Sequence, residues 1–162
     1  MEKAKIMEEL YKSLLSGVDT LTEQLKSHLF GMTELEGPVL MLVNDQGELC
    51  ANHPSRVAFL NEEPNVLSVI CRQIDDGYDP CVYAVEGGCV LGTQLATEET
   101  DCGRFLIFLP GYRGETVQAN MDLFELLLAQ VQLICQLIEK NNRLHHQQLS
   151  GLSQNSAVLC SR

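Results

Sequence analysis

The chain has 162 residues, 45% of them hydrophobic and 20% charged, a size that suits one globular core better than two domains. Its net charge of −11 is concentrated in residues 31–116, where 14 acidic side chains accompany only 4 basic ones. Four scattered arginines form no basic stripe for a phosphate backbone, which disfavours direct nucleic-acid binding. The longest apolar stretch, residues 126–138, is interrupted by glutamines and is shorter than a bilayer crossing, so we expect no membrane insertion.

The beginning of the chain and its cysteines indicate a location. Residues 1–6 run into a mixed-charge amphipathic pattern and not into the apolar core of a secretory signal. The seven cysteines are an odd number, include no C-x-x-C motif and lie mostly in apolar runs, which is typical of reduced thiols packed as small hydrophobic side chains. We therefore expect a cytoplasmic protein.

The first 30 residues are predicted to be an N-terminal helical segment, either one helix or two. Ser16-Gly17 is the expected break, and Thr20 with Glu23 suits a capping box on a second helix. The apolar positions with helical spacing are Ile6, Leu10, Leu14, Val18, Leu21, Leu25 and Leu29.

Residues 31–146 are expected to form the main domain. Short apolar runs separated by turn residues predict two hairpins, around Asn44 to Gly47 and around Gly87-Gly88, and a fifth strand ended by Pro110. A helix over residues 65–73 lies between the hairpins. The order predicts an α+β fold with a five-stranded antiparallel sheet, and with the N-terminal and long C-terminal helices packed on one face. The expected strands are residues 38–43, 48–52, 81–85, 89–95 and 103–109.

The helical spacing of apolar residues resumes near Thr116. The long C-terminal helix that it predicts is apolar on most of its circumference. Such a helix must be covered on more than one side, so we expect one face to pack on the sheet and another on a second copy, giving a homodimer. We assign the dimer interface to the stripe Phe124, Leu127, Val131, Ile134 and Ile138; a second stripe is Leu123, Leu126, Leu133 and Leu137.

Residues 147–162 are rich in Ser, Gln and Asn and are predicted to be a flexible polar tail.

Common catalytic and metal-binding signatures are absent from the sequence. Only His53 lies in the body of the chain, away from the helical regions of the other histidines, and we predict no catalytic residue. If Gly87-Gly88 is a two-residue turn, Cys81 and Cys89 lie on opposite faces of the sheet and do not share a metal ion. We predict neither a metal site nor a cofactor.

A cavity is the remaining site for small-molecule chemistry. The sheet face away from the helices must be covered by residues 53–80 and 96–102, and a gap beneath them would form a pocket. Tyr83 is an aromatic side chain with a polar tip inside a strand; the alternative interpretation is an ordinary core tyrosine. The predicted ligand-binding residues are Tyr83, Tyr78, Arg56, Arg72 and Cys81.

The opening hairpin at residues 39–49, the strand Gly88 to Leu95 and the flanking helices resemble a GAF or PAS-like sensor domain over about residues 20–144. The resemblance implies a non-catalytic signalling module that binds a small molecule or a partner protein and pairs its terminal helices between protomers. The chain departs from ligand-binding members in two ways: it has no cysteine-histidine dipeptide of the bilin-binding kind, and it lacks the N-K-x-x-x-F-x-x-x-D/E motif of cyclic-nucleotide GAF domains. A ligand-free interaction module and a cysteine-based redox or metal sensor are the alternatives.

Overall fold

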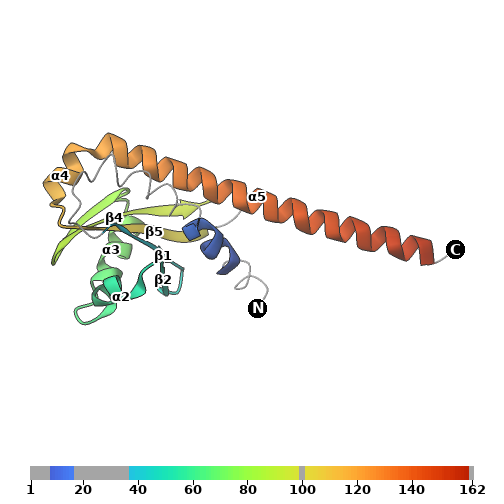
Figure 1. The fold of residues 1–162 in the computed structure, drawn as a ribbon, viewed down its shortest axis with the longest axis horizontal. Coiled ribbons are helices and arrows are strands. Elements are labelled where there is room, and N and C mark those ends of the chain that lie inside the picture. Colours follow the sequence, from blue (N-terminus) through green and yellow to red (C-terminus); the bar gives the residue numbers. More distant parts are fainter. Residues whose placement is uncertain (1–7, 17–36, 99–100, 161–162) are drawn as a thin grey trace.

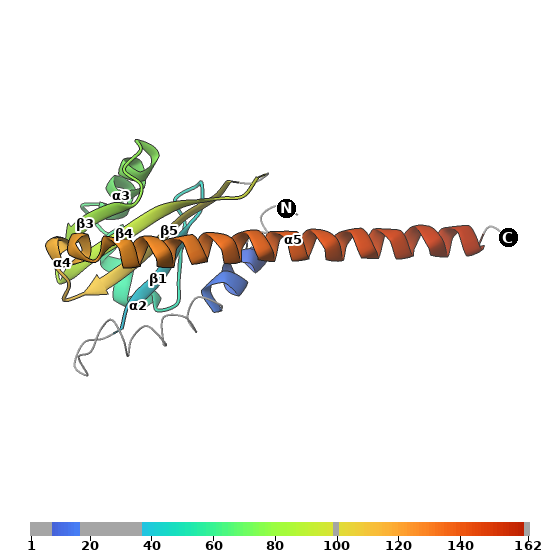
Figure 2. The same ribbon diagram turned by 90° about the horizontal axis from the view of Figure 1, so that it is seen from above.

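A computed structural model describes residues 8–16, 37–98 and 101–160 of the chain. Its centre is a five-stranded antiparallel sheet with the strand order β2-β1-β5-β4-β3, flanked by helices on both faces (Figures 1 and 2). This confirms the α+β fold predicted from the sequence. The strands are β1 (Val39–Val43), β2 (Leu49–Ala51), β3 (Cys81–Val85), β4 (Gly88–Ala96) and β5 (Asp101–Pro110).

The central strands are apolar on both faces because neither face meets water. In β1, Leu40 and Leu42 point into one buried cluster, whereas Val39 and Met41 point into another on the opposite side. Successive side chains in a strand alternate between faces, so an uninterrupted apolar run predicts cover on both sides.

The first layer consists of helical residues 8–16 and the long helix α5 (Met121–Cys160). The N-terminal helical stretch buries Leu10, Tyr11 and Leu14. Gly17, the second residue of the predicted break, lies outside the described residues. The predicted positions from Val18 to Leu29, with the capping box, lie outside the described residues.

The second layer consists of α2 (Pro54–Val57), η1 (Ala58–Asn61) and α3 (Val66–Asp75). The α3 helix begins where the Asn65 side chain accepts a hydrogen bond from the Ser68 backbone N–H at 3.0 Å. The helical spacing of Leu67, Ile70 and Ile74 places them on one face of α3, where they are buried against the sheet. The segment 53–80 thus covers the second face, as expected, whereas Ala96, Asp101 and Cys102 of the other expected cover belong to strands β4 and β5.

Two turns define the hairpins. In the first, Asn44 accepts hydrogen bonds from the backbone N–H groups of Gln46 and Glu48, and Gly47 adopts a positive φ of 81°. In the second, Val85 pairs with Gly88, so Glu86-Gly87 forms the turn, one residue earlier than predicted. The observed pairing of β3 with β4 is shifted from the predicted pairing by an even number of residues. Cys81 and Cys89 therefore lie on opposite faces of the sheet, as predicted.

Helix α5 follows the short helix α4 (Gly114–Ala119) and extends well beyond the sheet as one continuous rod of 40 residues (Figures 1 and 2). It includes residues 147–160, for which the sequence predicts a flexible polar tail. The physical reason for the helix is that residues 121–160 contain no proline and only one glycine, and leucine and glutamine favour helix.

Part of α5, Met121–Gly151, is long and apolar enough to span a membrane by length and composition. A mostly buried core helix meets the same criterion, and in this chain 28% of the apolar window is buried. Here Phe124 and Val131 pack against the sheet of their own chain.

Candidate functional site

The five predicted ligand-binding residues lie in different parts of the structure. Only two of them, Cys81 and Tyr83, lie on the same face of one strand. Cys81 is buried in β3, where its Sγ donates to Oε1 of Gln73 in α3 at 3.2 Å. Tyr83, two residues along, lies on the same face and is partly buried against the same apolar cluster.

The other three predicted residues lie elsewhere. Tyr78 is 67% exposed in the turn after α3, and Arg72 is exposed on α3 itself. Arg56 belongs to α2, and its Nη2 donates to the carbonyl oxygen of Gly37 at 2.6 Å. Helix α2 contacts β2, and four strand spacings, about 19 Å, separate β2 from β3. The structure therefore does not bring the five residues into one site.

The cysteines near β3 are packed side chains and not activated thiols. Burial raises the pKa of Cys81, and the Asp79 carboxylate raises it further. Burial also raises the pKa values of Cys71 and Cys89. A raised pKa keeps each thiol protonated, which is the unreactive form.

A different group of residues joins the start of β5 to both helices of the first layer. We call it the β5–α5 junction and define it as Tyr11, Cys102, Gly103, Gln132 and Cys135. The Tyr11 hydroxyl donates to the Cys102 carbonyl oxygen at 2.6 Å, in a buried hydrogen bond. Desolvation by burial raises the pKa of Tyr11, so the hydroxyl remains a donor at neutral pH.

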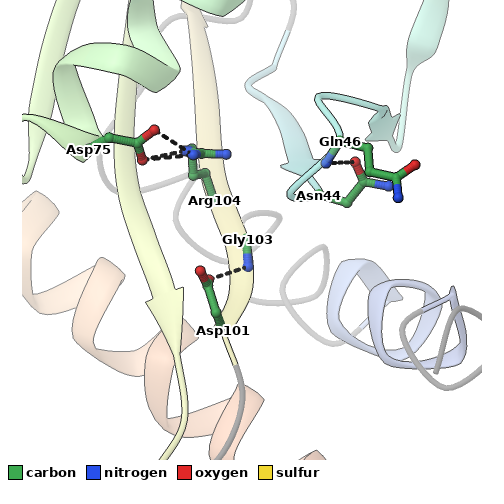
Figure 3. Close-up of polar contacts among 6 residues, drawn as sticks. All are labelled: Asn44, Gln46, Asp75, Asp101, Gly103 and Arg104. Carbon is green, nitrogen blue, oxygen red and sulfur yellow. Dashed lines mark hydrogen bonds and ion pairs between the residues drawn. The ribbon is translucent and has the colours of Figure 1, made fainter.

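Gly103 allows the backbone of β5 to approach this junction closely. Its φ is +90°, and a Cβ atom there would lie 2.2 Å from the Val43 carbonyl oxygen and 2.6 Å from the Tyr11 hydroxyl. The Asp101 carboxylate accepts from the Gly103 backbone N–H at 3.0 Å (Figure 3). No residue other than glycine fits this position without displacing β1 or the N-terminal helical residues.

On α5, two side chains one turn apart contact the sheet. The buried thiols of Cys102 and Cys135 form a hydrogen bond that lowers the pKa of Cys102 and raises that of Cys135, and burial adds to the rise at Cys135. The Gln132 amide donates to the Ala96 carbonyl oxygen, and its oxygen accepts from the Ala96 N–H at 3.4 Å. The end of β4 and the start of β5 are thus both connected to α5.

The opposite face of β5 is connected to α3 at the next residue. Arg104 donates to both carboxylate oxygens of Asp75, through Nε at 2.9 Å and through Nη2 at 2.6 Å (Figure 3). A paired geometry of this kind fixes orientation as well as distance. The start of β5 therefore contacts the helices on both sides of the sheet.

The structure places the predicted dimer stripe against the core of its own chain. Phe124, Leu127 and Val131 are 2%, 7% and 0% exposed within the core of their own chain, and Ile134 and Ile138 pack against that core. The second stripe faces away from the sheet and is exposed. Both stripes are apolar in the sequence, and only the position of the sheet shows which one is covered.

Sequence reasoning missed the β5–α5 junction because its members are far apart in the chain and match no motif. Among the residues that the structure describes, no group of three or more His, Cys, Asp or Glu is placed to hold a metal ion. No family model, curated protein or solved structure matches this chain.

Proposed function

We propose that this chain is a non-catalytic sensory or regulatory module of GAF or PAS-like character. In this module, a small molecule or a partner protein binds the α+β body and changes how the body packs against α5. Helix α5 then transmits this change through a dimer contact. The fold class and the resemblance of residues 39–49 and 88–95 to such domains support this proposal.

The observation that carries the proposal is the double role of α5. One face of its first half belongs to the core, through Phe124, Val131 and Cys135. The same helix then continues beyond the body without interruption (Figure 1). A movement of the sheet would reach the outer half of α5 through a single rigid element.

A route across the body supports this role. The Asp75–Arg104 pair connects α3 to β5, and the next two positions toward the start of β5, Gly103 and Cys102, belong to the β5–α5 junction. A ligand or partner that moved α3 would therefore act on a strand that contacts α5 directly.

Native mass spectrometry of the full chain, purified without refolding, tests the proposal. We expect twice the 18.0 kDa protomer mass. A retained organic adduct would support small-molecule sensing, whereas a bare dimer would favour the ligand-free interaction module. A bare monomer at micromolar concentration would contradict signalling through paired helices.

The Cys102–Cys135 contact favours a second candidate, a thiol redox sensor. Two thiols and one molecule of hydrogen peroxide would give one disulfide and two molecules of water, with the peroxide accepting two electrons. The bond would fasten α5 covalently to β5.

Intact-mass analysis after mild peroxide treatment tests the redox candidate. We expect the loss of two hydrogen atoms and a peptide linking residues 102 and 135. The Cys135→Ser variant removes this linkage, whereas the Cys71→Ser variant preserves it and serves as the control. The absence of the linked peptide in the wild type would exclude this mode of sensing.

A further inference from the structure

The exposed face of α5 has the spacing of a coiled-coil seam. Leu126, Leu133, Leu137 and Leu144 are 57%, 54%, 57% and 59% exposed, which is unusual for leucine on a helix that also supplies the core. Together with the polar residues Gln130 and Lys140, these leucines follow one another at alternating intervals of four and three residues. This is the spacing of the a and d positions of a heptad. The six seam residues, in order, are Leu126, Gln130, Leu133, Leu137, Lys140 and Leu144.

The outer half of this helix has no neighbour in the part of the chain that the structure describes. Figures 1 and 2 show it projecting from the body, away from the sheet and from helical residues 8–16. A lone helix in water is only marginally stable, and its stability normally comes from packing an apolar face. The seam begins on the inner half at Leu126, on the side of α5 turned away from the sheet, and reaches the projecting part at Leu144. The body therefore leaves the four seam leucines exposed, and a partner is needed to cover them.

The seam has a symmetry of its own. Its steps are 4, 3, 4, 3 and 4 residues, and its pattern of leucine and polar residues reads the same from either end. An antiparallel copy centred on residue 135 would place Leu126 opposite Leu144 and Leu133 opposite Leu137. It would also place Lys140 opposite Gln130, whose amide oxygen accepts a hydrogen bond from an ammonium group.

A parallel copy would use the same leucines but would place Lys140 against its own equivalent. Two like charges inside a seam repel, whereas the antiparallel arrangement separates them. The antiparallel arrangement also places the two strongly acidic bodies at opposite ends of the pair.

The distribution of charge along α5 also favours the antiparallel arrangement. Its first 18 residues contain two acids, Asp122 and Glu125, and no base. The next stretch contains Lys140, Arg143 and two histidines with one acid. In an antiparallel pair the acidic end of one helix lies alongside the basic stretch of the other.

We propose that the seam binds the same seam of a second copy, antiparallel and centred near residue 135. This inference rests on the dimer of the proposed function and adds the partner's orientation and register. The local two-fold axis then crosses α5 at the level of Cys135, which contacts Cys102 on the opposite side of the helix, so the dimer contact and the β5–α5 junction share one helical turn.

The first test asks whether the seam forms the dimer. By sedimentation equilibrium of the full chain, we expect the Leu133→Asp variant to weaken the dimer at least tenfold. The Leu149→Asp variant, at a leucine that is 51% exposed but off the seam, should leave the dimer unchanged. Both sites are exposed, and circular dichroism verifies that each variant is folded.

The second test measures orientation by the distance between two nitroxide labels, one per protomer, each on a ketone-bearing residue so that the native cysteines stay intact. At position 147 we expect the labels about 36 Å apart along the helices if they are antiparallel, but about 10 Å apart if they are parallel. At position 136 both arrangements give a short distance, which verifies that the labelled protein is a dimer.

These outcomes separate the two proposals. A short distance at position 147 together with a Leu133-dependent dimer overturns only the antiparallel orientation. A dimer insensitive to Leu133→Asp overturns the seam but leaves a paired module. A monomer, including one that binds neutral phospholipid vesicles through this face, overturns both the seam and the dimer of the proposed function.

Discussion

Gly103 shows how much of this structure depends on the absence of one side chain. Five described glycines adopt a positive φ. Gly103 also lacks room for a Cβ, whereas Gly47, Gly77 and Gly87 have open space at that position. At this position the backbone of β5 approaches both β1 and the Tyr11 hydroxyl. The site therefore combines a conformational requirement with a packing requirement.

Replacing this glycine should be far more destabilising than replacing one in an open turn. We expect Gly103→Ala to lower the free energy of unfolding by about 3 kcal/mol or more, because both backbone strain and displacement of Val43 contribute. Gly47→Ala, with a similar φ but open space around it, should lower it by about 1 kcal/mol. Urea denaturation of both variants measures the difference, and equal losses would show that crowding at Gly103 is unimportant.

Tyr11 should give the protein a specific sensitivity to alkali. Because burial raises its pKa above the ordinary 10.0, the native state keeps the proton at pH values where the unfolded chain has lost it. Its contribution to stability is complete below about pH 10 and decreases as the pH rises above that value.

The Tyr11→Phe variant isolates this effect. At neutral pH it should lose about 1–2 kcal/mol, because the buried hydrogen bond from the Tyr11 hydroxyl to the Cys102 carbonyl oxygen is removed. Between about pH 8 and about pH 11, its free energy of unfolding should fall less steeply than that of the wild type. Parallel slopes would show that Tyr11 ionises normally in the folded protein.

At the scale of elements, α3 offers a simple test of why a helix begins where it does. Asn65→Ala removes the acceptor for the Ser68 N–H and should destabilise the protein by about 1 kcal/mol. Asn65→Asp retains an acceptor and should remain near wild type. Thermal unfolding monitored by circular dichroism compares the two, and equal melting temperatures would mean that the cap contributes nothing.

Elements with a long regular pattern could be predicted from the sequence, whereas short elements could not. The uninterrupted apolar run of β1 predicts a strand that is covered on both faces, and the helical period of α5 continues for long enough to predict a long helix that is apolar on two sides. Helix α2 and η1 have four residues each, too few for a period to show. The polar composition of residues 147–160 predicts a flexible tail, whereas the absence of proline there permits the helix that the structure assigns.

The candidate site could not be predicted because its contacts join distant positions. Tyr11 and Cys102 are 91 residues apart, and no spacing rule connects a helical tyrosine to a strand carbonyl. Likewise, the sequence showed two apolar stripes on α5 but gave no means of choosing between them. That choice depends on which face of the helix the folded sheet covers.

At the scale of the whole molecule, the two halves of α5 should differ in their importance for folding. A chain ending at Gln118 loses Phe124, Val131 and Cys135 from the core and should not unfold cooperatively. A chain ending at residue 139 keeps these residues and should unfold in one transition, although its dimer should be weaker. Differential scanning calorimetry distinguishes them, and cooperative unfolding of the shorter chain would show that α5 is not part of the core.

The attachment of α5 near Gln132 and Cys135 makes the helix a lever with unequal arms. From Met121 to this fulcrum the helix measures about 21 Å, and from the fulcrum to Cys160 it measures about 38 Å, at 1.5 Å per residue. A stiff rod tilting about that point would turn about 1 Å of travel at its inner end into nearly 2 Å at its outer end. The body therefore needs only a small rearrangement beneath α4 to produce a displacement that a partner of the outer helix could detect.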